Sequence, residues 1–394
     1  MWTFFLATSS TQLFLATERE PKAGPQTASG PLWQVDLRPL GYNGFTPKGE
    51  LWGEHFKINS VCFSGDSSLI VTFLTREVVA TLSRRDKSSD QVPLRLHAVF
   101  IDADKGAVKT ASEWPSSEPR GGILPARGGR FIVVTPERLL LYSPSLELLK
   151  DFKLRTEDNP PFELAGVYSS PAGGSILLQY NDYHKYWFQW MDPDILQPLR
   201  SWEEVLAWIT ISDTKLAFSH ETYTKPTGFL YEVLIRGIDG ASQTVCRSVN
   251  GDDDCGISPQ FISNELLALS TFRGLRLIRS DGTMALVTKF KANEELWRTL
   301  SPSANGNRFA VQQFVNKGGS ALLDISSHGV FHRIVVFDVP TSQWIYNLEA
   351  KSQSITTFPN FALSPDGSKL AVLADGVVEV YQLPSAVSHG GIPH

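Results

Sequence analysis

The chain has little of what most metal, membrane and nucleic-acid proteins show in their sequences. Only three of its 394 residues are cysteines, and histidines do not accompany them at the spacing that a zinc site needs. No stretch approaches the roughly eighteen consecutive apolar residues that a membrane helix requires. The formal net charge is −5, so we expect no basic surface that attracts nucleic acid or anionic lipid.

Local catalytic motifs are also absent from the sequence. It has no Gly-x-Ser-x-Gly nucleophile turn, no His-Glu-x-x-His zinc motif, no glycine-rich phosphate loop ending in Lys-Ser or Lys-Thr, and no dinucleotide fingerprint. We therefore assign no catalytic, cofactor-binding or metal-binding residue and expect no cofactor. A site assembled from distant residues stays open, because such a site leaves no local motif.

What the chain does have is a repeated strand pattern, clearest in residues 361–384. Phe361 to Ser364 is a short apolar strand, Pro365 to Ser368 has tight-turn residues, and Lys369 to Leu373 returns as a second strand. A further turn leads into an alternating strand over Val377 to Leu383. Ten tryptophans, 23 phenylalanines and 24 prolines likewise favour strands and turns.

Degenerate copies of this unit recur at intervals of about 40 to 60 residues, the range expected of propeller blades. The seven copies begin at Val61, Ile123, Val167, Ala207, Pro259, Thr299 and Phe361. A second hairpin follows in six of them, beginning at Leu96, Leu139, Tyr186, Tyr231, Leu275 and Ile334. Two hairpins make four antiparallel strands, so the pattern predicts an all-β, seven-bladed β-propeller with four-stranded blades.

The last copy lacks a fourth strand, whereas the first copy has a spare strand in front of it. Leu32 to Leu37 has period-two character and no partner of its own. In a ring this segment can pair with Val377 to Leu383, which completes the last blade and removes an exposed sheet edge. We therefore expect one propeller domain over residues 31–384, closed by its N-terminal strand.

The repeats resemble those of the WD-repeat or WD-like β-propeller family. The strongest match is Ser364-Pro365-Asp366-Gly367 followed by Lys369 to Val372, with weaker matches at Phe63 to Asp66 and at Ser301-Pro302. Neither a Trp-Asp nor a Gly-His dipeptide occurs, so the hydrogen-bonded polar core of the strict family is not carried over. The resemblance covers roughly residues 31–384 and implies a blade scaffold with a bias towards binding proteins.

The two ends of the chain read differently from the repeats. Trp2 to Ala7 and Leu13 to Ala16 are apolar like a weak secretion signal, but no basic residue precedes them. A signal remnant and a disordered leader both stay open, and Glu18 to Gly30 has the composition of a spacer. We expect residues 1–30 to be leader and flexible spacer and residues 385–394 to be a disordered tail. A secreted or periplasmic location is slightly favoured over the cytoplasm.

Loop length indicates where a partner binds. Turns between first and second strands are short, whereas the connections between second and third strands are long over Leu74 to Arg95, Ser219 to Phe229 and Phe314 to Phe331. Binding residues usually lie on long loops of a rigid scaffold, so we expect the interaction face there, with tolerated insertions as the alternative. The candidate contact residues are Asp182, Tyr183, His184, His220, Glu221 and Arg273.

The aromatic stretch from Tyr180 to Trp190 has two interpretations. Tyr186, Phe188 and Trp190 on one side of a strand, with Trp187 on the other, fit packing between blades. A stacking platform for a sugar or a peptide stays open only for Asp182, Tyr183 and His184.

The cysteines and the acidic runs give weaker signals. Cys246 and Cys255 flank the loop RSVNGDDD, and this spacing permits a disulfide if the protein is exported. Cys62 lies between apolar neighbours of an inner strand and is expected to be buried. Asp252 to Asp254 lacks the alternating carboxylates and terminal Glu of calcium loops, so we expect a solvated turn. Asp102 to Gly106 has the residues of a hairpin turn.

Three functions stay open from the sequence alone. The leading one is a non-enzymatic scaffold that binds a protein partner on the long-loop face, because the chain has no catalytic motif. The second is an enzyme or carbohydrate-binding propeller, which needs groups such as His184, His220, Glu221, Arg273 and His332 to converge at the central channel. The third is a structural component of an exported or envelope assembly. The sequence gives no indication of oligomeric state.

Overall fold

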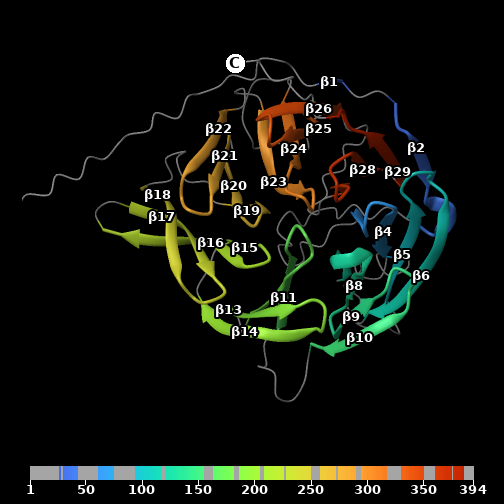
Figure 1. Ribbon diagram of the computed structural model, residues 1–394, viewed down its shortest axis with the longest axis horizontal. Coiled ribbons are helices and arrows are strands. Elements are labelled where there is room, and N and C mark those ends of the chain that lie inside the picture. Colours follow the sequence, from blue (N-terminus) through green and yellow to red (C-terminus); the bar gives the residue numbers. More distant parts are fainter. Residues whose placement is uncertain are drawn as a thin grey trace, which may run out of the picture.

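Seven antiparallel sheets form the blades of a ring (Figure 1). The computed structural model describes residues 26–27, 30–42, 61–74, 94–116, 121–154, 163–181, 186–204, 208–225, 228–249, 258–271, 274–289, 294–316, 330–349, 360–374 and 376–385. Six blades contain four strands, and the sixth blade carries a fifth. The predicted all-β, seven-bladed propeller is confirmed.

Blades 1 to 4 are each built from four consecutive strands. Blade 1 contains β3 (Val61–Phe63), β4 (Ser68–Leu74), β5 (Leu94–Asp102) and β6 (Val108–Ser116). Blade 2 contains β7 (Gly122–Pro125), β8 (Phe131–Val134), β9 (Arg138–Tyr142) and β10 (Leu148–Lys153), with the short 3-10 helix η2 (Arg127–Gly129) in its first turn. Blade 3 contains β11 (Glu163–Ser169), β12 (Ile176–Asn181), β13 (Tyr186–Asp192) and β14 (Gln197–Glu204). Blade 4 contains β15 (Trp208–Ile211), β16 (Lys215–Thr224), β17 (Gly228–Gly237) and β18 (Ser242–Val249).

Blade 5 is also built from four consecutive strands, whereas blades 6 and 7 each add a strand from the N-terminal end of the chain. Blade 5 contains β19 (Ser258–Ser263), β20 (Leu266–Thr271), β21 (Gly274–Arg279) and β22 (Met284–Lys289). Blade 6 contains β23 (Glu294–Pro302), β24 (Arg308–Asn316), β25 (Val330–Asp338) and β26 (Gln343–Glu349), and β1 (Gln26–Thr27) adds in parallel to β26. Blade 7 contains β27 (Phe361–Leu363), β28 (Lys369–Ala374), β29 (Val377–Gln382) and β2 (Trp33–Asp36), and the 3-10 helix η1 (Arg38–Leu40) follows β2.

A serine at the start of the first turn helps to make the hairpins. In blade 7 the Ser364 N–H donates to the Lys369 carbonyl at 3.0 Å, and the Lys369 N–H donates to Ser364 Oγ at 2.9 Å. Gly367 in this turn has a φ of 75°, which confirms the predicted tight turn and its need for glycine. Equivalent serines stand in five other blades, namely Ser64, Ser170, Ser212, Ser263 and Ser303.

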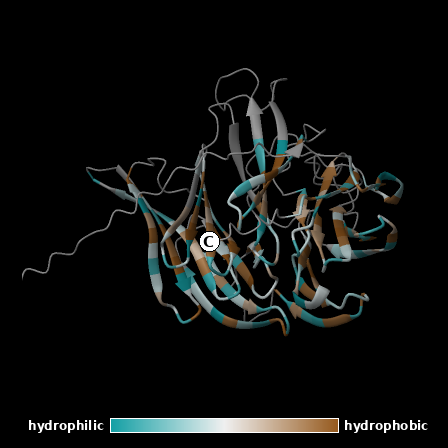
Figure 2. Ribbon diagram, turned by 45° about the horizontal axis from the view of Figure 1, so that its top comes forward, coloured by the Kyte–Doolittle hydropathy of each residue, from teal (hydrophilic) through white to brown (hydrophobic). Residues whose placement is uncertain are grey.

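Apolar side chains fill the space between neighbouring blades. The buried residues form seven clusters, one at each contact between adjacent blades. Figure 2 shows hydrophobic bands along the strands of neighbouring blades. Burial of one large aliphatic side chain contributes about 1.5–3 kcal/mol, so the ring is held mainly by these contacts.

The N-terminal strand closes the ring as predicted. β2 pairs antiparallel with β29, with Trp33 opposite Val380 and Asp36 opposite Val377. The Trp33 indole N–H also donates to the Ala103 carbonyl of blade 1 at 3.1 Å, so this side chain bridges the last and first blades.

The antiparallel order of the strands defines two faces of the ring. Connections between first and second strands, and between third and fourth strands, lie on one face, which we call the turn face. Connections between second and third strands lie on the other, which we call the hairpin face. No helix in the described ranges is long and apolar enough to cross a membrane.

One of the three predicted long loops on the hairpin face is wrong. Ser219 to Phe229 is not a loop, because β16 continues to Thr224, β17 begins at Gly228, and these two residues pair. The other two connections run through residues 75–93 and 317–329, which lie outside the described residues.

Candidate functional site

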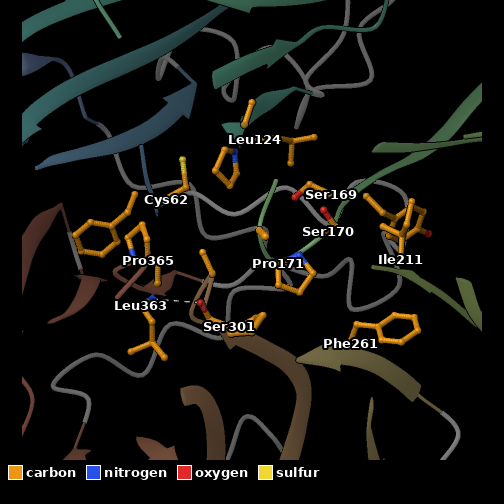
Figure 3. Close-up of a pocket in the computed structure, with 18 of the residues that line it drawn as sticks. Cys62, Leu124, Ser169, Ser170, Pro171, Ile211, Phe261, Ser301, Leu363 and Pro365 are labelled. Atoms are coloured by element: carbon orange, nitrogen blue, oxygen red, sulfur yellow. Dashed lines mark hydrogen bonds between the residues drawn. The ribbon is translucent and has the colours of Figure 1, made fainter. Parts of the chain in front are cut away.

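The first strands of all seven blades, with the first turns of several of them, enclose a central channel with a cavity volume of about 320 Å³. Figure 3 shows side chains from different blades around this cavity, among them Cys62, Leu124, Ile211, Phe261 and Leu363. Most of the residues that line it are apolar, and hydroxyl and amide groups lie between them. A cavity enclosed by several elements, with a few polar groups in its wall, is the first place to look for a ligand or an active site.

The polar groups of the channel wall are largely used to join one blade to the next. The Phe261 N–H donates to Thr210 Oγ1 at 3.3 Å. The side-chain amide of Gln260 pairs with the backbone of Leu300 as a neighbouring strand would. It donates to the Leu300 carbonyl at 2.9 Å and accepts from the Leu300 N–H at 3.0 Å. The Leu363 N–H donates to Ser301 Oγ at 3.3 Å (Figure 3). These groups therefore stabilise blades 4 to 7 against one another.

Arg127 is the single charged residue among the described residues that line the channel. Its guanidinium reaches across blade 3 and forms an ion pair with Asp213 of blade 4 at 2.6 Å. The hydrogen bond that the Arg127 guanidinium donates to the Asp213 carboxylate raises the pKa of Arg127. Asp213 also accepts from the Ser170 hydroxyl and from the Gly174 N–H. The described channel wall thus presents no acid–base pair of the kind that hydrolases use.

Cys62 gives a test of how closed the channel is. Its side chain is buried and free, and burial raises the pKa of its thiol to about 12. In the unfolded chain a thiol ionises at about pH 8.5. The burial of the neutral Cys62 thiol therefore contributes fully to the stability of the fold below that pH, and this contribution is lost as the pH rises towards 12. We expect iodoacetamide at pH 8 to modify Cys62 at least about a hundredfold more slowly in the native protein than in urea, measured by peptide mass spectrometry. Equal rates would show that solvent enters the channel freely.

The hairpin of β16 and β17 is the second feature of functional interest. Each strand has ten residues, the longest of the described strands. Within the described residues β15 pairs with β16 from Leu216 to Ser219, and β16 runs on from there for five residues, about 17 Å at a typical strand rise, paired with β17. At the left of Figure 1, β16, β17 and β18 reach away from the ring.

The side chains near the tip of this hairpin are polar and aromatic. Tyr223 is 59% exposed, and Lys225 is exposed beside it. His220 and Thr222 lie on the other side of β16, with the Thr222 hydroxyl 3.4 Å from His220 Nδ1. Lower down, Arg247 of β18 forms an ion pair with Glu232 at 2.9 Å. This surface can offer stacking, charge and hydrogen bonding to a partner.

The predicted contact residues are placed only in part. His220 and Glu221 lie on β16, paired with Glu232 and Tyr231, and neither is among the described residues that line the channel. The side chain of Glu221 is outside the description, as are Asp182, Tyr183, His184 and Arg273. The described residues therefore do not bring these groups together in the channel, and their role at a partner interface stays a prediction.

The described residues also place part of the aromatic stretch from Tyr180 to Trp190. Phe188 and Trp190 are buried between blades 3 and 4, with Tyr186 packed against them, and Trp187 packs between blades 2 and 3, so the blade-packing interpretation is confirmed.

The described residues test only some of the predictions about the acidic residues and the cysteines. Asp102 accepts the backbone N–H groups of Asp104 and Lys105, which confirms the hairpin turn. Cys246 lies on β18, but Cys255 and the run Asp252 to Asp254 lie outside the described residues. The disulfide and the solvated acidic turn therefore stay predictions, and so does the exported location.

Comparisons with known proteins identify the architecture. None of the known protein families matches the sequence, and no curated protein matches it. A chain of the mitotic checkpoint complex has a similar fold, with a TM-score of 0.51 and 11% identity over 98% of this chain and 100% of that one. Hsv2 from Kluyveromyces lactis gives 0.46 and 11% over 76% and 92%, and the Cps50 (Swd1) β-propeller domain from Myceliophteria thermophila gives 0.46 and 12% over 74% and 93%.

The likeness to the chain of the mitotic checkpoint complex agrees with the observed fold and says nothing of the activity. At such low identity the similarity shows the fold alone. The protein is a seven-bladed β-propeller, and its membership of the WD-repeat family stays a prediction.

Proposed function

We propose that the protein is a non-enzymatic scaffold that binds a protein partner on the hairpin face. The observation that carries the proposal is the β16–β17 hairpin, which extends beyond the described part of its inner strand and presents Tyr223 and Lys225 to solvent. A strand pair that protrudes from a rigid ring costs conformational entropy without adding to the core, so a binding role accounts for it. Aromatic side chains with a polar surround are typical of contact surfaces between proteins.

Two further points support a scaffold. The single charged group of the described channel wall, Arg127, is already ion-paired with Asp213, so no observation favours a catalytic site there. The chain of similar fold with the highest coverage reported above comes from the mitotic checkpoint complex, which is an assembly of proteins.

Shortening the hairpin tests the proposal. In one variant Asn-Gly replaces residues 221–231, so that His220 and Glu232, which already pair, flank a two-residue turn. The matched control is Leu148→Ser with Leu149→Ser, which alters an exposed surface on blade 2. In affinity capture from the source cell, we expect wild type and control to retain a stoichiometric partner. The hairpin variant is expected to lose it by at least about tenfold.

The unfolding midpoint separates a lost interface from a lost fold. The hairpin variant keeps the channel, the first strands and the pairing of Val233 with Cys246, so its urea midpoint is expected to stay close to that of wild type. If the hairpin variant is folded and still retains the partner as well as the wild type does, the proposal is contradicted.

A further inference from the structure

The cavity of the central channel lies towards the turn face of the ring. Besides the first strands, its lining includes residues from the first turns of five blades, namely Gly65, Arg127, Pro171, Ala304 and Pro365. Its volume of about 320 Å³ is at the lower end of the range for small-molecule sites, which is about 300–1,000 Å³. Any molecule that this cavity holds is therefore small.

Apolar side chains surround the cavity from blades on different sides of the ring. Leu124 of blade 2, Ile211 of blade 4, Phe261 of blade 5 and Leu363 of blade 7 are all buried and line it (Figure 3). Blade 1 adds the thiol of Cys62, which stays uncharged at neutral pH because burial raises its pKa to about 12. Most of the surface that a molecule in the cavity would meet is thus apolar.

The wall of the cavity also has few backbone hydrogen-bond donors. Five of the lining residues are prolines, which have no backbone N–H and whose rings fix the backbone angle φ; they are Pro125, Pro171, Pro259, Pro302 and Pro365. All five stand in first strands or first turns. The prolines therefore make this part of the wall both rigid and poor in donors.

Polar groups of the wall already have protein partners. Thr210, Gln260 and Ser301 bond to backbone groups of the neighbouring blade, and the Arg127 guanidinium is paired with Asp213. A charged molecule, or one with many hydroxyl groups, would lose its hydrogen bonds to water on entering and would find few replacements. The wall therefore favours molecules that need few hydrogen bonds.

We propose that the cavity of the central channel is a binding site for one small, uncharged molecule made mainly of aromatic or alicyclic hydrocarbon. Binding removes apolar surface of both the molecule and the wall from water. The wall is built from strands and proline-containing turns, so little ordering is needed when the molecule binds. The site goes beyond the proposed scaffold function, because it lies in the ring and not on the hairpin.

Two dyes that differ mainly in charge test the chemistry of the site. The probe is N-phenylnaphthylamine, which is neutral and fluoresces strongly only in apolar surroundings, and the control is its sulfonated analogue, anilinonaphthalene sulfonate. In titrations of the native full-length protein we expect saturable binding of the neutral dye at one site. The sulfonated dye is expected to bind at least about tenfold more weakly, because its charge would be buried without a partner.

Tryptophan substitutions at the mouth of the cavity assign the binding to the channel. Ala172 is an exposed residue of the first turn of blade 3 and lines the cavity, as does Ala304 in the first turn of blade 6. Ala172→Trp and Ala304→Trp are each expected to weaken binding of the neutral dye at least about tenfold, because an indole takes up part of the cavity. The matched control is Ala241→Trp, in an exposed turn of blade 4 that is not among the lining residues, and it is expected to bind like wild type.

Urea unfolding identifies which variants are folded, and only those are compared. No saturable binding of the neutral dye to the wild type, or equal binding of the sulfonated dye, would overturn the proposal. Wild-type affinity in both folded channel variants, or an equal loss in Ala241→Trp, would show that the dye binds elsewhere and would overturn it too. The hairpin experiment measures a protein partner and this one a dye, so failure of either is distinguishable from failure of the other.

Discussion

Replacing Arg308 by methionine is expected to destabilise the protein by about 3–5 kcal/mol, because it leaves a buried carboxylate without its cation. The Arg308 and Asp338 side chains are 8% and 2% exposed, and Arg308 Nε lies 3.0 Å from Asp338 Oδ1. The same guanidinium donates to the Gly367 and Pro384 carbonyls of blade 7, each at 2.8 Å. Arg308→Met therefore also leaves two inter-blade carbonyls without their donors.

The matched control for this prediction is Arg247→Met. Arg247 also pairs with a carboxylate, Glu232, at 2.9 Å, but its side chain is 65% exposed, so its loss is expected to cost at most about 1 kcal/mol. Urea unfolding followed by circular dichroism measures both. If the two variants unfold at the same midpoint, Arg308 does not hold blade 6 to blade 7.

Gly106→Ala is the substitution expected to disturb ring closure most. Gly106 has a φ of 70°, and a Cβ atom built there would lie 2.7 Å from the Trp33 indole carbon Cδ2. The left-handed backbone costs an alanine about 1–2 kcal/mol, and displacing the packed indole adds about 1–3 kcal/mol. Since Trp33 bridges β2 to Ala103 of blade 1, we expect faster amide hydrogen exchange over residues 33–36 as well as lower stability.

Gly128→Ala separates the two costs. Gly128 has nearly the same φ, 69°, but an added Cβ there would meet nothing within 4 Å. This control is expected to lose only the backbone term, about 1–2 kcal/mol, and to leave exchange in β2 unchanged. Equal exchange in the two variants would mean that Trp33 does not hold the closing strand.

The propeller could be predicted from the sequence because its hairpins depend on local chemistry. Ser364 to Lys369 and the glycine at Gly367 specify a turn within a few residues of one another. Closure of the ring could be predicted because residues 32–37 form a strand without a partner in the first repeat, and the last repeat lacks its fourth strand. The serine that recurs at the first turn of six blades was also present in the sequence, but its hydrogen bonds become evident only in the structure.

The contacts between blades could not be predicted in the same way. Gln260 bonds Leu300 forty residues away, and the Asp366 N–H donates to Asp66 across a separation of 300 residues. Such pairs leave no periodic pattern, because each partner sits in its own turn or strand. The same reason hides the ion pair of Arg127 with Asp213, which spans a whole blade.

The error at residues 219–229 has a clear physical origin. Residues 220–225 lack the alternating apolar pattern of the strands on either side, so the pattern assigns them to the connection, yet Thr222, Tyr223 and Thr224 are residues that favour strands. A strand pair that leaves the core no longer needs alternating apolar residues, so the pattern used to detect buried strands fails there. For the same reason the β16–β17 hairpin, which best supports a binding role, could not be predicted from its apolar pattern.

A photo-crosslinking amino acid in place of Tyr223 tests the central claim most directly. In the source cell, irradiation is expected to join this position to one partner protein, and the same amino acid in place of Leu149 is expected to give no such adduct. An adduct specific to position 223 would place a partner on the hairpin face. Absence of any adduct from a folded, expressed protein, or identical adducts from both positions, would contradict the scaffold account.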